Sequence, residues 1–472
     1  MKKTKRKLPL MHSFARIKPA SADKKGGIAA SQTITGFDEN AGSVTIGSSV
    51  DGAKGKARVF DHFEATIGPE TSQTKTYEKI CAPLVESWIN GYDVDVICYG
   101  QTGSGKTYTQ FGPPHSMKKA FDSLGKNGGV GTISSDGIMS DNYGFILRTG
   151  FEGLKAVTKY IKENNNTNAM LHGSMVEFSI LNAKSQCASD LLNNKKKCFV
   201  DKYHHLEGAI HLPLTDARTL VEMAAAVEGR LERGTKMNNS SSRSHCITAF
   251  TLHVRDDEGN VRVSRFNFFD FMGSERFRGA NAAHNQSQSA HSTMAGAEGI
   301  FANYSLLFLG EAVRAAANAR RKKKGSISQM GGSGFLNELL HGSLVGNAIT
   351  AMITCLSPSK RNGAESLLSC KYSKDMAKMQ NDPKQQKNIP FATKVEEITK
   401  EHAKSYKIAS GGVLGKYQQK RMAEVTGYEN TLNILKELGS GGRHDDDGGG
   451  GGGGGKEQAI DGDEGGGSGK KK

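Results

Sequence analysis

The stretch VDVICYGQTGSGKTYTQFG, residues 94 to 112, decides how the rest of this sequence is read. The apolar run from Val94 to Tyr99 predicts a buried strand. Residues 100–107 then fit G-x-x-x-x-G-K-[ST], the pattern of a loop whose backbone N–H groups surround phosphate oxygens. In such a loop the following helix adds its positive N-terminal dipole. We therefore expect a nucleotide-binding loop between a strand and a helix.

The residues of this loop are the expected nucleotide contacts. Glycine lets the backbone turn inward, Lys106 neutralises the β- and γ-phosphates, and the Thr107 hydroxyl reaches Mg²⁺. The alternative is a glycine-rich surface turn, and the strand in front of the loop argues against it. The expected nucleotide-binding residues here are Gly100, Gln101, Thr102, Gly103, Ser104, Gly105, Lys106, Thr107 and Tyr108.

Two further segments carry chemistry that belongs with such a loop. NNSSSRSH at 238–245 offers hydroxyls for Mg²⁺ and an arginine that can pair with a carboxylate, although alone it reads as a serine-rich loop. FNFFDFMGSE at 266–275 is an apolar strand that ends at Asp270, with Gly273 three positions later. In D-x-x-G the aspartate holds Mg²⁺ through water and the glycine N–H bonds the γ-phosphate. Together the three segments indicate a nucleoside triphosphatase.

The expected nucleotide is ATP. A phosphate loop followed by D-x-x-G also describes GTPases, but those need an N-K-x-D motif that reads guanine. The sequence has no such motif, and the nearest run, NNKKKC at 193–198, lacks the aspartate. Tyr108 follows the loop directly and can stack on a base without selecting guanine.

With these motifs in place, the sequence resembles the kinesin motor family. YGQTGSGKTYT is similar to the family's phosphate loop almost letter for letter, and NNSSSRSH and DFMGSE resemble its first and second switches. EGIFANYSLLFLGEAV resembles the switch helix, GSLVGNAITAMITCLSP a later family run, and HSFARIKP the opening strand. The resemblance spans about residues 12 to 380, a whole motor domain. It implies a P-loop NTPase motor fold, an α/β domain whose central, mostly parallel twisted sheet has helices on both faces.

The resemblance also implies how the nucleotide is held. Arg16 and Pro19 line the adenine side, and Tyr108 stacks on the base. Lys106 contacts the phosphates. The implied Mg²⁺ ligands are Thr107, Ser242 and Asp270.

A catalytic set around the γ-phosphate follows from the same resemblance. Asn238 and Ser241 help to close over the γ-phosphate, and Gly273 senses it. Arg243 and Glu298 form a salt bridge between the switches, and Glu298 relays a proton from the attacking water. This agrees with the physics of phosphoryl transfer, which depends mainly on positioning and charge stabilisation.

Departures from the family concentrate on the surface that meets the microtubule. The family's P-Y-R-D-S-K-L-T reads SQMGGSGFLN at 328–337, without its arginine and lysine, and Tyr304 replaces the lysine of I-N-K-S-L. Phe271 and Met272 replace the smaller Leu-Ala of the second switch. The nucleotide site therefore matches the family better than the track surface does.

One basic run argues for a microtubule partner all the same. In some monomeric kinesins a lysine cluster in the same loop tethers the motor to acidic tubulin tails, a salt-sensitive attraction. A solvated loop or a nuclear-targeting run is the alternative. The expected partner-binding residues are Arg320, Arg321, Lys322, Lys323 and Lys324.

Composition indicates which kind of partner and which cellular compartment to expect. Lysine and arginine number 63 against 48 acidic residues, a net charge of +15 that favours an acidic partner. The seven cysteines form no C-x-x-C pair, which predicts reduced thiols in a cytosolic protein rather than disulfides or a zinc site. His204 and His205 are adjacent, a poor arrangement for metal binding, and are expected on a solvated surface. No apolar run is long enough to span a membrane, and no secretory signal is expected.

The chain divides into four predicted regions. A basic extension covers 1–10, and a motor domain covers 11–380 with a surface insertion at 113–142. Residues 381–438 form a short helical neck or tail, in which one amphipathic helix docks on the domain and an extended coiled-coil dimer is not expected. Residues 439–472 are a glycine-rich disordered tail.

Three functions compete at this stage. The first is a microtubule-stimulated, ATP-hydrolysing motor of the cytoplasmic cytoskeleton, with the cilium or axoneme as a more specific location. The second is a non-motile microtubule-associated protein that retains ATP binding, motivated by the lost track residues. The third, an unrelated P-loop ATPase acting on nucleic acid, is disfavoured by the ordered switch motifs. Partner chains or cargo are expected to bind through the C-terminal region.

Overall fold

The structure is a computed structural model that describes residues 11–20, 33–48, 56–116, 119–120, 141–163, 168–179, 187–201, 205–236, 244–274, 309–310, 313, 335–411 and 415–440. The strands are β1 (His12–Ile17), β2 (Ile34–Asp38), β3 (Ser43–Ile46), β4 (Arg58–Phe60), β5 (Ala65–Ile67), β6 (Val94–Tyr99), β7 (Asn168–Ser179), β8 (Ala188–Asp190), β9 (Lys197–Val200), β10 (Leu206–Glu207), β11 (Leu212–Pro213), β12 (Ser244–Arg255), β13 (Asn260–Asp270), β14 (Ile349–Leu356) and β15 (Ile389–Pro390). The helices are α1 (Gln73–Ile80), α2 (Ala82–Ile89), α3 (Lys106–Phe111), α6 (Phe145–Glu163), α8 (Ala217–Lys236), α10 (Phe335–Leu339), α11 (His341–Val345), the 3-10 helix η4 (Lys360–Asn362), α12 (Gly363–Met376), α13 (Phe391–Ser410) and α14 (Lys416–Ser440).

A large sheet in the order β10-β9-β8-β7-β12-β13-β6-β14-β1-β5 forms the centre of the fold, with β11 and β15 pairing at its side. The pairs of β13 with β6, β6 with β14, β14 with β1 and β1 with β5 are parallel. From β13 outward through β12, β7, β8, β9 and β10 the pairs are antiparallel. The expected α/β fold is therefore confirmed, but the sheet is mixed rather than mostly parallel. The short turn between β12 and β13 forces that pair to be antiparallel.

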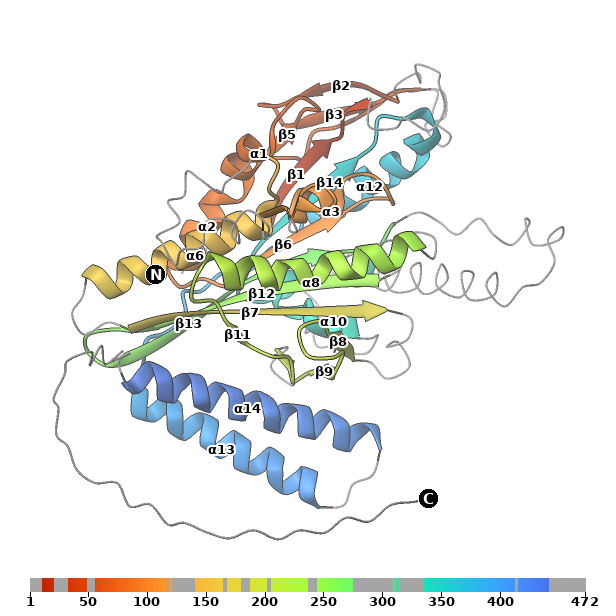
Figure 1. Cartoon of the computed structure of the whole chain (residues 1–472). Coiled ribbons are helices and arrows are strands. Elements are labelled where there is room, and N and C mark those ends of the chain that lie inside the picture. Colours follow the sequence, from red (N-terminus) through yellow and green to blue (C-terminus); the bar gives the residue numbers. More distant parts are fainter. Residues whose placement is uncertain are drawn as a thin grey trace, which may run out of the picture. The chain divides into compact units, whose positions relative to one another are not determined.

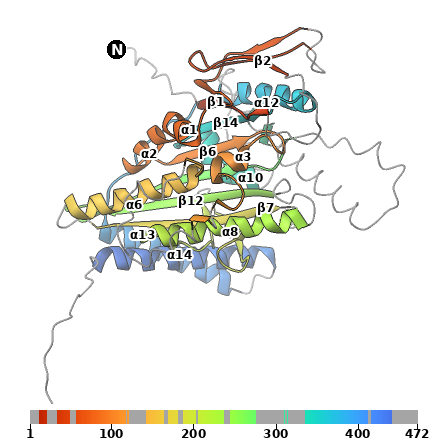
Figure 2. The ribbon, with the colours of Figure 1, turned by 45° about the horizontal axis from the view of Figure 1, so that its top comes forward.

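Helices cover both faces of this sheet (Figures 1 and 2). On the first face α1, α2, α6 and α8 pack on alternate strand residues such as Val94, Val96 and Phe268. On the second face α10, α11 and the end of α12 pack on Ile97 and Phe269. This alternation follows from the period of two along a strand, and it buries the sheet on both sides.

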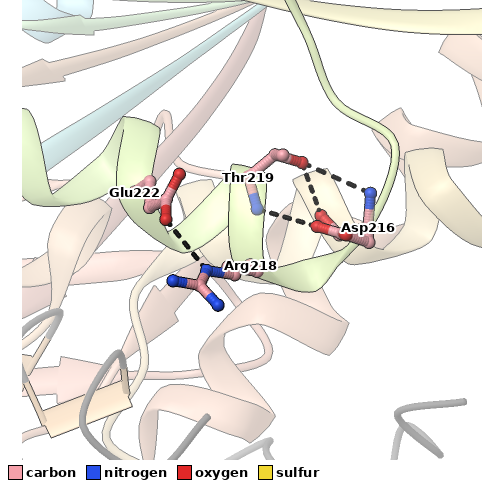
Figure 3. A network of polar contacts seen from close by, with 4 residues as sticks. All are labelled: Asp216, Arg218, Thr219 and Glu222. Carbon is pink, nitrogen blue, oxygen red and sulfur yellow. Dashed lines mark hydrogen bonds and ion pairs between the residues drawn. The ribbon is translucent and has the colours of Figure 1, made fainter. Parts of the chain in front are cut away.

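Local sequence explains two helix boundaries. Helices α1 and α2 are separated at Cys81, because Pro83 has no N–H for a continuous helix. The start of α8 is capped by Asp216, whose carboxylate accepts from the N–H of Thr219 at 2.8 Å (Figure 3). The Thr219 hydroxyl in turn lies 3.3 Å from the N–H of Asp216 and accepts from it. These reciprocal bonds satisfy N–H groups that the helix itself leaves unpaired.

The chain after the last motor helix folds back onto the second face. β15 pairs antiparallel with β13, and α13 and α14 then run side by side in place of the single short helix predicted for this region (Figure 1). Leu435 and Leu438 of α14 pack with Val261 of β13. At the end of α14, Arg255 donates to the carbonyl of Gly439 at 3.1 Å, which satisfies a terminal acceptor.

Two further findings bear on the setting. All seven cysteines are buried free thiols, in agreement with the sequence. No helix within the described ranges is both long and apolar enough to cross a membrane.

Candidate nucleotide site

The phosphate loop lies where parallel strands end. β6 and β13 are parallel neighbours, and their register pairs Cys98 with Asp270. The loop that follows β6 and the segment that follows β13 therefore leave the same edge of the sheet, which is where ligands bind in such folds. The loop ends at Gly105, after which α3 begins at Lys106, as the sequence predicts.

Two glycines of the loop are required by its path. Gly100 has φ +150°, and a Cβ there would collide with the carbonyl oxygen of Cys355. Gly105 has φ +107°, where a side chain is strained, and nothing lies within 4 Å of a Cβ built on it. The first glycine lets two strands approach, while the second leaves open space on the side that a phosphate would occupy.

Lys106 is buried over this loop. Its Nζ donates to the carbonyl oxygens of Gly100 at 2.8 Å and Gln101 at 2.9 Å. These bonds use two of the three N–H donors of the ammonium. The charge is therefore positioned inside the loop, with a donor left for an anionic ligand.

The segment expected to sense the γ-phosphate contacts the loop directly. The Thr107 hydroxyl donates to Oδ2 of Asp270 at 2.7 Å, and the N–H of Ser274 donates to the carbonyl of Gly100 at 3.1 Å. Gln110 of α3 adds a bond to the carbonyl of Phe269 at 3.0 Å. A hydroxyl and a carboxylate are the hard oxygen ligands that Mg²⁺ prefers, so the residues present fit that ion.

Two buried polar atoms of the loop are available to form hydrogen bonds with a ligand. Oε1 of Gln101 and Oγ of Ser104 are buried, and neither has a hydrogen-bond partner in the described part of the chain. Buried polar atoms are nearly always hydrogen-bonded, so unpaired ones mark places where ligand groups or water bind. Both lie in the segment that the sequence assigns to phosphate.

The expected adenine side is assembled from β1 and α3. Arg16 donates to the Thr109 hydroxyl at 2.8 Å, and its guanidinium lies 5.4 Å from the centre of the Tyr108 ring. Burial lowers the pKa of Arg16. Tyr108 is 41% exposed, so one face of its ring is accessible to a planar base. Pro19 is exposed just beyond the end of β1.

Sequence reasoning missed Lys18 as part of this site. Its Nζ donates to the carbonyl of Gly103 at 2.9 Å. Lys18 lies two positions after Arg16, and residues two apart on an extended chain project to the same side, which is the signal that would have found it.

The run NNSSSRSH leads into β12, beside Asp270. Ser244 donates to Glu177 at 2.7 Å, and Nδ1 of His245 lies 3.4 Å from the N–H of Met272 and accepts from it. Cys246 pairs with Asp270 in the sheet. The described ends of the two proposed switches thus lie on neighbouring strands. The remaining predicted site residues, which fall outside the described residues, are Asn238, Ser241, Ser242, Arg243, Glu298, Arg320, Arg321, Lys322, Lys323 and Lys324.

A family model described as the kinesin motor domain matches residues 16–379. The chain belongs to the kinesin motor family. Kinesin-like protein KIN-4B of Arabidopsis thaliana is 31% identical over 350 residues, which cover 70% of this chain and 31% of that protein. Kinesin-like protein KIF27 of Mus musculus is 29% identical, over 70% of this chain and 22% of its own length. The chain thus spans less than a third of the length of these relatives.

Solved kinesin structures share the fold. A structure of a fast kinesin aligns with a TM-score of 0.60 at 23% identity, over 80% of this chain and 94% of that one. A KIF14 dimer bound to AMP-PNP and a microtubule aligns with a TM-score of 0.57 at 22% identity, over 80% and 96%. The P-loop motor fold expected from the sequence is therefore confirmed.

The bulky residues of the segment predicted to form the second switch pack in the core. Phe271 and Met272 are both buried in the cluster on the second face of the sheet. The same cluster contains Phe335 and Leu336 of α10, the helix at the end of the altered segment 328–337. The two departures from the family motifs thus meet in one packed core, where side-chain volumes must fit together.

Proposed function

We propose that this chain is an ATP-hydrolysing kinesin motor domain that couples the state of the γ-phosphate to its affinity for microtubules. One observation carries the proposal: the Thr107 hydroxyl is bonded to the Asp270 carboxylate, so the phosphate loop and the D-x-x-G segment share one site. In phosphoryl transfer the groups that hold Mg²⁺ and sense the γ-phosphate must converge in this way. Bound Mg²⁺ would neutralise charge on the β- and γ-phosphates.

Each residue of the site has a proposed part. Arg16, Pro19 and Tyr108 bind adenine, the loop from Gly100 to Lys106 binds the phosphates, and Thr107 with Asp270 and Ser242 holds the metal. Asn238 and Ser241 close over the γ-phosphate while Gly273 donates its N–H to it. Arg243 and Glu298 join the two switches, and Glu298 accepts the proton that leaves the attacking water.

The proposed partner is the microtubule, in the cytoplasm and including the ciliary axoneme. The basic run at 320–324 is proposed to attract acidic tubulin tails, which makes binding salt-dependent. The KIF14 structure shows a protein of this fold bound to a microtubule, which supports the proposal.

Single-turnover and binding assays test the catalytic part. Lys106→Ala should abolish nucleotide binding, whereas Glu298→Ala should retain binding and block hydrolysis. Unchanged turnover in Glu298→Ala would remove Glu298 from the mechanism. A DNA- or RNA-binding activity that competes with tubulin would instead favour a nucleic-acid ATPase.

A second candidate is a non-motile microtubule-associated protein that retains ATP binding. It is favoured by the altered segment 328–337, which lacks the basic side chains of the family motif. A surface-gliding assay separates the two. Movement of microtubules over immobilised protein in ATP supports the motor, and ATP-independent binding without movement supports the alternative.

A further inference from the structure

The antiparallel β9–β10 hairpin at the edge of the main sheet brings together three side chains of types that can coordinate a metal ion. Leu206 pairs with Val200, which places His205 opposite Asp201. The N–H of Asp201 donates to the carbonyl of His205 at 2.9 Å, and the N–H of His205 donates to Oδ1 of Asp201 at 2.8 Å. Glu207 is two positions beyond His205, so both side chains project from the same side of the strand.

The result is a compact set of potential ligands. One ligand atom each from Asp201, His205 and Glu207 lie within 4.8 Å of one another, and no other such trio occurs among the described residues. Asp201 is buried, and the other two side chains are partly buried. This arrangement differs from the sequence expectation, which put His205 on a solvated surface. The sequence alone did not predict this cluster, because strand pairing is what brings Asp201 to His205.

Helix α14 closes over these residues. A Cβ at Gly427 would collide with a carboxylate oxygen of Glu207, so Glu207 lies directly against the helix backbone. Tyr428, the next residue of α14, is buried. The trio is thus enclosed between the hairpin and the C-terminal helices.

Among the described residues, Arg265 is the cation whose charge acts on Glu207. The Glu207 carboxylate has no hydrogen bond or ion pair within the described part of the chain. Asp201 and Glu424 add negative charge near Glu207, and Arg265 adds positive charge. Glu424 is itself paired with Arg421. A carboxylate enclosed in this way is stabilised by a cation.

We propose that Asp201, His205 and Glu207 bind a divalent transition-metal cation, with Zn²⁺ as the best match, and that the ion fastens the β9–β10 hairpin under α14. An imidazole nitrogen with two carboxylate oxygens suits Zn²⁺, whereas Mg²⁺ and Ca²⁺ prefer oxygen alone. Two carboxylates and one divalent ion also leave no net charge to bury. The nucleotide site does not share these residues.

Zinc binding to the full chain tests the proposal. Isothermal titration with Zn²⁺ alone, after removal of metal by a chelator, should show a specific site, and elemental analysis should recover one equivalent of zinc. Glu207→Gln and His205→Asn should each weaken the site by at least about 10-fold, the loss seen even for outer-sphere partners. An excess of Mg²⁺ should not compete.

The matched control is His402→Asn. His402 of α13 lies 3.4 Å from Glu429 of α14, and no third potential ligand joins this pair among the described residues. This variant should retain the wild-type affinity. Equal zinc binding in wild type, Glu207→Gln and His205→Asn would overturn the proposal, as would the absence of binding to the wild type.

Hydrogen exchange tests whether bound zinc also holds the β9–β10 hairpin against α14. Zinc should slow exchange across 416–440 in the wild type and in His402→Asn but not in Glu207→Gln. Circular dichroism identifies a variant that fails to fold, in which case Asp201→Asn replaces it. Zinc binding without added protection of α14 would contradict the fastening role.

Discussion

The Thr107 hydroxyl and the Asp270 carboxylate lie 2.7 Å apart although 163 positions separate them in the sequence. This bond joins the start of α3 to the end of β13, so the loop that would hold phosphates and the segment that would sense them are mechanically connected. The predictions below start from it.

Asp270→Asn should keep the side-chain volume and an acceptor oxygen but remove the charge that favours Mg²⁺. We expect Mg²⁺-dependent ATP affinity to fall and turnover to drop by about 100-fold or more, the scale of losing one electrostatic contact to a transition state. Nucleotide binding with and without Mg²⁺ measures this. Thr158→Ala on the exposed part of α6 is the control, since Thr158 bonds only its own helix. An Asp270→Asn variant with unchanged Mg²⁺ dependence would exclude Asp270 from the metal site.

Tyr108→Ala should weaken ATP binding by removing the ring on which a base stacks. Arg16 lies over the same ring, and the combined loss of stacking and packing is expected to be about 1 kcal/mol, roughly five-fold in affinity. Phe in place of Tyr108 keeps the ring and should bind as the wild type does. Fluorescent-nucleotide titration distinguishes the two variants, and equal weakening by both would show that the hydroxyl, not the ring, is used.

Acid should destabilise the fold through buried histidines on the second face. Burial lowers the pKa of His172 and of His211 to about 4, and it lowers the pKa of His253 as well. Because the folded pKa values lie below the unfolded value of 6.5, the stability is present above pH 6.5 and is lost as the pH falls toward 4. On the order of 1–2 kcal/mol per histidine should be lost near about pH 5. Urea unfolding across this range measures it.

His12 serves as the control for the acid prediction, because its contribution to stability changes with pH in the opposite direction. Glu64 raises the pKa of His12, so His12→Gln should remove stability that is present at low pH and disappears as the pH rises. His172→Gln should flatten the acid loss instead. Comparison with the wild type cancels the contribution of buried acids such as Asp95, whose pKa burial raises to about 6. An unchanged pH profile in His172→Gln would refute the assignment.

Leu438→Ala should loosen the C-terminal helices. Leu438 is fully buried against Val261, and truncating such a leucine costs about 2–5 kcal/mol of packing. Faster hydrogen exchange across α13 and α14 is the expected readout. Met422→Ala on the same helix is the matched control because Met422 is 47% exposed. Equal effects of the two substitutions would mean that α14 does not depend on this contact.

The local sequence pattern predicted much of the candidate site, but it did not predict which strands pair across the sheet. The apolar run before Gly100 depends on neighbours in sequence and forms the strand expected there, and the cap of α8 at Asp216 is likewise local. The antiparallel half of the sheet and the approach of His205 to Asp201 depend on strand register, which no local period encodes. The division between α1 and α2 has a local cause in Pro83, which lacks the N–H that a continuous helix needs.

Resemblance to a family predicted the roles that single motifs left open. Asp270 and Thr107 meet as the kinesin comparison implies, and Arg16 lies beside Tyr108. The roles of all these residues stay predictions, and Arg243 and Glu298 also lie outside the described part of the chain. The sequence predicted one docked helix after residue 380, but not the second helix or the packing partners, since the apolar contacts of Leu435 and Leu438 join segments far apart in the sequence.

The coupling of ATP turnover to microtubules is the central claim, and a steady-state titration tests it most directly. ATP hydrolysis by the full chain is measured at low salt with increasing microtubules, beside Lys106→Ala and a variant in which the basic run 320–324 is neutralised. The account predicts a saturable rise in turnover that Lys106→Ala abolishes and that neutralisation shifts to higher microtubule concentrations, with added salt having the same effect. Turnover that stays at its basal rate at every microtubule concentration would contradict it.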